Sequence, residues 1–159
     1  MNGGIQALLG WVLVLGIGSA LATEAGEAAG ARIIQTDERH PIGSYLTDEQ
    51  GRSVYMFEAD SSNQTTCYDA CAQAWPPVLT DGRPTAGPGV DESLLGTIER
   101  ADGSLQVTYN GWPLYYFIKD SESGDINGQG VNGFGADWYL LTPGGQVARA
   151  EGTEERPRG

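Results

Sequence analysis

A six-residue pattern, Y-x-F-x-x-D, occurs twice in the chain, and the two copies start 60 residues apart. The first copy runs from Tyr55 to Asp60 and the second from Tyr115 to Asp120. Each copy has a glycine four residues before its tyrosine, and a tryptophan followed by a Leu-Thr pair after it. An internal repeat indicates that each copy is one structural unit and that neighbouring units pack together. We therefore expect one small domain built from two copies of a β unit.

The repeated motif has the alternation of a strand that is covered on both faces. Alternate side chains of a strand share a face, so Tyr55 lies on the same side as Phe57, and Tyr115 on the same side as Phe117. The opposite face is also apolar, with Met56 in the first copy and Leu114, Tyr116 and Ile118 in the second. Strands with two apolar faces are expected in the interior of a domain.

Turn signals between the strands predict antiparallel hairpins. Asp-Gly at 102–103 and Asn-Gly at 110–111 each separate two β-rich runs, and further turns are expected at 48–51 and 143–145. One helix is expected over residues 67–74, with Thr66 as its N-cap and the prolines after Trp75 ending it. The 24 Gly residues of the chain fit many turns. The sequence therefore predicts an all-β fold of mainly antiparallel hairpins with one short helix, as two tandem repeats in one domain.

Composition divides the chain into four parts. An apolar run that ends at an A-x-A cleavage site predicts a secretory signal peptide, with an uncleaved anchor as the alternative. A Gly/Ala/Glu-rich stretch predicts a flexible lead-in, in which Ile33-Ile34 is a candidate edge strand. The predicted boundaries are 1–22 for the signal peptide, 23–40 for the lead-in, 41–148 for the two-repeat β domain (repeat 1 about 43–82, repeat 2 about 98–148) and 149–159 for a disordered tail.

The formal net charge of −12 restricts the partners. An acidic surface repels nucleic-acid phosphates and anionic headgroups, so nucleic-acid binding is not expected. No membrane span is expected after signal cleavage, and no cofactor is predicted. The partner is expected to be an unknown envelope component or a small ligand, in the periplasm or outside the cell.

The two cysteines, Cys67 and Cys71, are expected to form a disulfide. An exported protein meets an oxidising compartment, where a thiol pair is normally oxidised. Residues four apart in a helical turn have Cα atoms about 6 Å from each other, a distance that a disulfide spans. The alternative is redox chemistry or metal handling by the same pair, because a C-x-x-x-C pair can exchange disulfides or bind copper.

The aspartate that closes each motif has two interpretations. Asp60 and Asp120 come just after a strand, where a short carboxylate accepts backbone N–H bonds and stabilises a turn. The same two residues are also a candidate hydrolytic pair, if the repeats face each other. A calcium site formed by Asp120, Glu122 and Asp125 is a further candidate, although Gly124 stands at a ligand position.

No catalytic residue is predicted. The single histidine, His40, lies in the lead-in, so no Ser-His-Asp or Cys-His arrangement is expected around it. Trp75 and Trp138 are expected in the core because they recur in both repeats. Trp112 follows the Asn-Gly turn and is a possible ligand platform.

These motifs resemble the bacterial "secreted repeat of unknown function" family, predicted lipoproteins with a Yx(FWY)xxD motif. The resemblance rests on both six-residue copies, on residues 67–71 leading into 74–77, and on residues 109–115, and it spans about 43–141. It implies an exported protein of two repeats and no established activity. The chain has no cysteine near Ala22 for lipid attachment, unlike lipoprotein members.

The sequence thus predicts an exported, non-catalytic periplasmic or secreted repeat protein that acts as a binding or structural envelope module. The alternative is a redox or metal-handling protein that uses Cys67 and Cys71.

Overall fold

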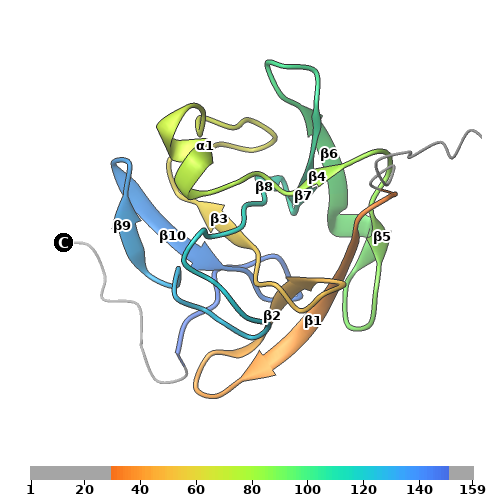
Figure 1. Cartoon of the computed structure of the whole chain (residues 1–159). Helices are drawn as coiled ribbons and strands as arrows, with labels where there is room; N and C mark the ends of the chain where they lie inside the picture. The colour runs from red at the N-terminus through yellow and green to blue at the C-terminus, as the bar shows by residue number, and fades with distance from the viewer. Residues whose placement is uncertain (1–29, 151–159) are drawn as a thin grey trace, which may run out of the picture.

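The computed structural model describes residues 30–150 and arranges them in three small β-sheets (Figure 1). The first sheet has the order β2 (Gly43–Asp48), β1 (Ile33–Arg39), β5 (Thr85–Ala86), and the second β3 (Tyr55–Phe57), β10 (Ala136–Leu140), β9 (Val131–Gly133). The third contains β4 (Leu79–Thr80), β7 (Leu105–Tyr109), β6 (Leu95–Glu99) and β8 (Trp112–Pro113), which pairs with β7. The helical pieces are α1 (Ala70–Ala74) and a 3-10 turn, η1 (Glu92–Leu94). The all-β prediction with a short helix is confirmed.

Hairpins surround the centre of the domain. Figure 1 shows β1 and β2 at the bottom, β9 and β10 at the left, and β6 and β7 at the upper right, with β3 and β8 between them. The predicted turns at 102–103 and 110–111 are confirmed, and they join β6 to β7 and β7 to β8. Asn110 and Gly111 both have positive φ, 49° and 80°, which is why Asn-Gly suits this two-residue turn.

The two repeats interlock through pairs of matching hydrogen bonds. The Tyr55 N–H donates to the Tyr115 carbonyl (2.8 Å), and the Tyr115 N–H donates to the Tyr55 carbonyl (2.9 Å). At the turns, the Gly124 N–H donates to the Gly51 carbonyl (3.1 Å), and the Asn63 N–H donates to the Gly111 carbonyl (2.8 Å). Since each bond has a counterpart with the repeats exchanged, the two units are related by an approximate twofold axis near Tyr55 and Tyr115.

The two faces of the motif strands enter two different parts of the core. Tyr55, Phe57, Tyr115 and Phe117 pack in one cluster with the disulfide. The residues that alternate with them along the chain belong to a second cluster, whose members include Val54, Met56, Leu114 and Tyr116. The predicted covering of both faces is confirmed for these residues. It is wrong for Ile118, which is 65% exposed because the chain leaves the core there.

Four aromatic rings form a continuous stack at the centre of the first cluster. Trp75 and Trp138 are parallel, with ring centroids 3.9 Å apart. Trp75 also stacks on Phe117, and Trp138 on Phe57, both at 4.0 Å. Each tryptophan therefore stacks on the phenylalanine of the other repeat. Trp75 and Trp138 are almost fully buried, as the recurrence of tryptophan in both repeats predicts.

Two predicted elements are shorter than expected. The helix was expected over 67–74 with Thr66 as N-cap, but α1 begins at Ala70 because Asp69 has a φ of 52°, which a helix cannot include. The expected strand over 113–118 is regular only in β8. Beyond it the chain pairs with residues 74–78, where Pro76 and Pro77 have no N–H to donate.

Two other elements differ in extent or pairing. β1 runs from Ile33 to Arg39, so a full strand occupies part of the segment that was expected to be a flexible lead-in. The hairpin expected around residues 48–51 is reduced to a bridge between Thr47 and Ser53. β3 instead pairs with β10 of the second repeat, and its first residue, Tyr55, also exchanges backbone hydrogen bonds with Tyr115.

The predicted signal peptide at 1–22 lies outside the described residues, as do residues 151–159 of the predicted tail. Within residues 30–150, no helix has both the length and the apolar character that a membrane crossing requires.

Candidate functional site

The tyrosine of each motif bonds the aspartate of the other motif. The Tyr115 hydroxyl donates to Asp60 Oδ2 (2.6 Å), and the Tyr55 hydroxyl donates to Asp120 Oδ2 (2.7 Å). The second oxygen of each carboxylate caps its own turn. Asp60 Oδ1 accepts from the Thr66 N–H (2.7 Å), and Asp120 Oδ1 accepts from the Asn127 N–H (2.9 Å). The turn bonds are those that the sequence predicts, whereas the exchange of tyrosines between repeats is not predicted.

Burial shifts the pKa of both members of each Tyr–Asp pair. It raises the pKa of Asp60 and of Asp120, while the hydrogen bond from the partner tyrosine acts in the opposite direction. Burial and the neighbouring carboxylate together raise the pKa of Tyr55 and of Tyr115, so both phenols remain protonated donors at neutral pH. Both oxygens of each aspartate therefore accept a hydrogen bond from the protein.

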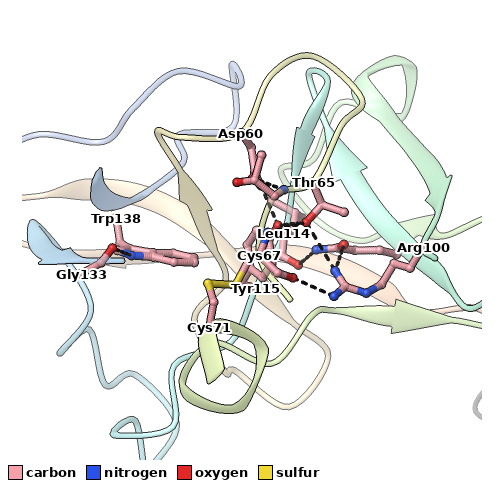
Figure 2. The surroundings of a disulfide bond; sticks show 11 residues. Asp60, Thr65, Cys67, Cys71, Arg100, Leu114, Tyr115, Gly133 and Trp138 are labelled. Atoms are coloured by element: carbon pink, nitrogen blue, oxygen red, sulfur yellow. Dashed lines mark hydrogen bonds between the residues drawn. A yellow bond between two sulfur atoms is a disulfide. The ribbon is translucent and has the colours of Figure 1, made fainter. Parts of the chain in front are cut away.

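The two cysteines form a disulfide between the turn and the short helix (Figure 2). Cys67 and Cys71 are bonded, with Cα atoms 5.2 Å apart, as the sequence predicts. Cys67 is fully buried and Cys71 is 7% exposed. The disulfide ties the segment after Asp60 to the base of α1. Its surroundings in Figure 2 are the Asp60–Tyr115 pair, Trp138 and Arg100.

Arg100 is a buried cation behind this segment, and the sequence analysis did not single it out. It is 5% exposed, and its guanidinium donates to the Cys67 carbonyl and to Gln106 Oε1, both at 2.8 Å. It also donates to the Thr65 hydroxyl (3.4 Å) and lies 4.5 Å from the centre of the Tyr68 ring. The sequence does contain a related pair, because Glu38-Arg39 precedes Glu99-Arg100 by 61 residues, and Arg39 also donates to a loop carbonyl, that of Gly124.

A groove opens on the surface over this buried network. It lies between the segment that carries the disulfide and the end of β6, and its volume is about 260 Å³. The lining residues come from both repeats: Asn63, Gln64, Thr65, Thr66, Tyr68, Ile98 and Glu99. Behind them, the Thr65 hydroxyl bonds the Tyr115 hydroxyl and the Thr66 hydroxyl donates to Asp60. The groove wall is therefore held by the same buried residues that join the repeats.

The calcium candidate is not assembled. Two N–H groups, those of Ser121 and Glu122, donate to Asp125 Oδ2 (2.9 and 3.0 Å), and Asp120 is bonded to Tyr55. In the part of the chain that the structure describes, no group of three or more His, Cys, Asp or Glu residues is placed to hold a metal ion. The described residues therefore give the calcium prediction no support.

Trp112 is not a free platform. It is partly buried and packs against the second core cluster. The exposed aromatic rings within residues 30–150 are instead Tyr68, 37% exposed in the groove, and Phe134, 52% exposed in the turn between β9 and β10. From the sequence, Phe134 lies near a turn and could also belong to an aromatic platform, whereas nothing in the sequence singles out Tyr68.

Comparison with known families agrees with the internal repeat. The family described as "Secreted repeat of unknown function" matches residues 38–79 and 96–142, one match in each repeat and together more than half of the chain. The chain belongs to this family of secreted repeats. Neither a curated protein nor a solved structure matches it.

Proposed function

We propose that this protein is an exported, non-catalytic binding module that acts in the periplasm or outside the cell and holds its ligand in the groove between residues 63–68 and β6. The observation that carries the proposal is the contrast between this groove and the repeat motif. The motif's aspartates and tyrosines are bonded to each other, whereas the groove presents polar side chains to solvent over a rigid buried wall. Preformed hollows with a few convergent polar groups are where small ligands bind.

A non-catalytic role follows from the placement of the acidic residues. Glycoside hydrolysis by a carboxylate pair, the arrangement considered for Asp60 and Asp120, usually requires two carboxylates that both face the substrate. The groove lining holds one, Glu99, and Asp60 behind it is 5% exposed and bonded to Tyr115 and Thr66. An arrangement with one free carboxylate is suited to binding rather than to acid–base chemistry.

The cysteine pair supports the same proposal. A disulfide that exchanges with a partner must be reached by an attacking thiolate. Cys67 is fully buried and Cys71 nearly so, with Cys67 beneath Arg100. We therefore assign the disulfide to holding the groove wall in place. Redox handling remains the alternative prediction, and a thiol titration of the native protein tests it, because a pair kept reduced in air contradicts the structural role.

The test is retention of the purified full chain on isolated envelope material of the producing cells. We expect the wild-type protein to be retained and Tyr68→Ala to be lost, because Tyr68 is the aromatic residue of the groove. Phe134→Ala is the matched control, since Phe134 is also an exposed aromatic but does not line the groove. Circular dichroism and the melting temperature establish that each variant is folded.

Two results contradict the proposal. One is a wild-type protein that is not retained on any envelope fraction. The other is a folded Tyr68→Ala protein retained as well as the wild type, which places the contact elsewhere on the surface.

A further inference from the structure

We propose that the groove binds a neutral saccharide, taking one or two sugar rings of a longer chain. This inference rests on the proposed function and names its ligand class. Six of the seven lining residues carry a hydroxyl, amide, phenol or carboxylate, and Ile98 is the one aliphatic member. A volume of about 260 Å³ lies just below the range of about 300–1,000 Å³ usual for small-molecule sites, which suits one end or one segment of such a chain.

The aromatic member of the groove is positioned from behind. The Arg100 guanidinium lies 4.5 Å from the centre of the Tyr68 ring, and Arg100 is itself fixed by Gln106 and the Cys67 carbonyl. A cation over one face of a ring holds the ring in place. Tyr68 remains 37% exposed and lines the groove. A rigid, amphipathic ring is suited to stack on the C–H face of a sugar while polar groups around it bind hydroxyls.

Asn63, Gln64 and Glu99 present polar groups that can bind hydroxyls, whereas the Thr65 and Thr66 hydroxyls are bonded inward to Tyr115 and Asp60. Among residues 30–150, no side chain hydrogen-bonds the Asn63 amide or the Glu99 carboxylate, and only the carbonyl oxygen of the Gln64 amide is used, by Ser61. An amide offers donors and an acceptor, and a carboxylate accepts through both oxygens. Vicinal hydroxyls of a sugar both donate and accept, so this mixed set of planar groups matches them.

The charge and the composition of the lining disfavour anionic ligands and peptides. Glu99 is exposed in the lining and the chain carries a formal charge of −12, so an anionic ligand is repelled. β6 lies at the edge of its sheet, where an extended peptide can add as a strand. Peptide grooves also provide apolar pockets for alternate side chains, and the lining here offers one aliphatic side chain, Ile98, beside the Tyr68 ring. The lining therefore favours a saccharide over a peptide.

The experiment is calorimetric titration of the full chain with a panel of neutral oligosaccharides that includes chitotetraose and cellotetraose. We expect binding to at least one of them, weakened about tenfold by Tyr68→Ala and by Glu99→Gln, which remove the stacking ring and the charged acceptor. Glu38→Gln is the matched control, because Glu38 pairs in β1 as Glu99 does in β6, 61 residues later, and does not line the groove. It should leave the affinity unchanged.

The outcomes separate the two proposals. If no neutral oligosaccharide binds while envelope retention still requires Tyr68, the saccharide inference is overturned and the binding module stands. Loss of that retention after protease treatment of the envelope then identifies a peptide ligand. Saccharide binding that neither Tyr68→Ala nor Glu99→Gln weakens also overturns the inference, because the sugar then binds outside the groove. Absence of both saccharide binding and envelope retention contradicts both proposals.

Discussion

The two repeats have the same interior and different loops. In each, the motif tyrosine bonds the aspartate of the other repeat, and the tryptophan stacks on the phenylalanine of the other repeat. After the aspartate the repeats diverge. The first continues into a disulfide and α1, whereas the second continues through a turn-rich segment without regular elements as far as β9. The groove lies against the first of these loops.

The two loops contact the tyrosine of the other repeat in different ways. In the second repeat the Gly128 N–H donates to the Tyr55 hydroxyl (3.2 Å), and a Cβ at Gly128 would lie 2.8 Å from that ring. The loop backbone therefore packs directly on the tyrosine. In the first repeat the contact is made by a side chain, the Thr65 hydroxyl. What the repeats share thus holds the domain together, and the loop that differs lines the groove of the proposed site.

The largest loss of stability is expected from removing the stacked tryptophans of the shared interior. Trp75→Ala and Trp138→Ala should each lower the free energy of unfolding by about 3–5 kcal/mol, the usual cost of deleting a fully buried Trp side chain. The two losses should be similar, because the residues occupy equivalent places in one stack. Urea denaturation measures them.

Trp112→Ala is the comparison variant for this test. Trp112 is only partly buried, so its loss should be clearly smaller, although larger than that of a surface residue. A Trp138 variant as stable as the wild type, or losses for Trp75 and Trp138 that differ by several kcal/mol, would contradict the equivalence of the repeats.

The next test breaks the exchanged hydrogen bonds. Tyr115→Phe removes the donor to the buried Asp60 Oδ2, while the bonds from Thr66 to Oδ1 remain. It should cost about 3 kcal/mol, near the upper end for a bond to a charged group. Tyr55→Phe should cost about half as much, because Asp120 is only half-buried and water can replace the phenol. Equal losses of unfolding free energy in the two variants would contradict this difference in burial, because they would show that the two loops shield Asp60 and Asp120 from water equally.

Much of the interior could be predicted from the sequence. The alternation of Tyr55, Met56 and Phe57 predicted which residues share a face, and the repetition of tryptophan predicted its burial. These predictions hold because burial depends on local periodicity. The helix start could not be predicted in the same way, because Asp69 adopts a φ of 52°, a backbone conformation that is uncommon for residues other than glycine and that the local sequence does not indicate.

The candidate site was harder to predict for a physical reason. Tyr115 and Asp60 are 55 residues apart, and only the packing of one repeat against the other decides which tyrosine meets which aspartate. Arginine is usually a surface residue. The burial of Arg100 depends on two acceptors, Gln106 in the neighbouring strand and the carbonyl of Cys67, which is 33 residues away. The groove was missed because its lining residues come from two segments that the sequence separates by about thirty residues.

Removing the disulfide tests the loop that distinguishes the first repeat. The double variant Cys67→Ser, Cys71→Ser opens a loop of a few residues, and the chain-entropy relation gives a loss of about 2 kcal/mol. We expect the second repeat to keep its structure, so that amide exchange rises mainly in residues 61–74. Protection lost equally at β9 and β10 would contradict a role confined to the first loop.

The smallest effect is a difference in pH dependence. Burial raises the pKa of Asp60 and Asp120, so the folded protein retains protons that the unfolded chain, with an ordinary pKa of about 3.9, has already lost. Their contribution to stability is therefore fully present below about pH 3.9 and is lost as pH rises through the folded pKa values. Asp120→Asn removes one of the two groups, so its unfolding free energy should fall less than that of the wild type as pH rises from about 4.

Asp102 supplies the control of opposite sign. It is fully exposed, and hydrogen bonds from Ser104 lower its pKa, so it contributes stability above the unfolded pKa that is lost as pH falls through the folded value. Asp102→Asn should therefore remove a gain of stability as pH rises toward about 3.9, whereas Asp120→Asn makes the loss above that pH shallower. Urea titrations at several pH values between about 3 and 7 measure both slopes. If the Asp120→Asn curve runs parallel to that of the wild type, the carboxyl of the second repeat has no raised pKa, and the buried pairs of the two repeats are electrostatically unlike.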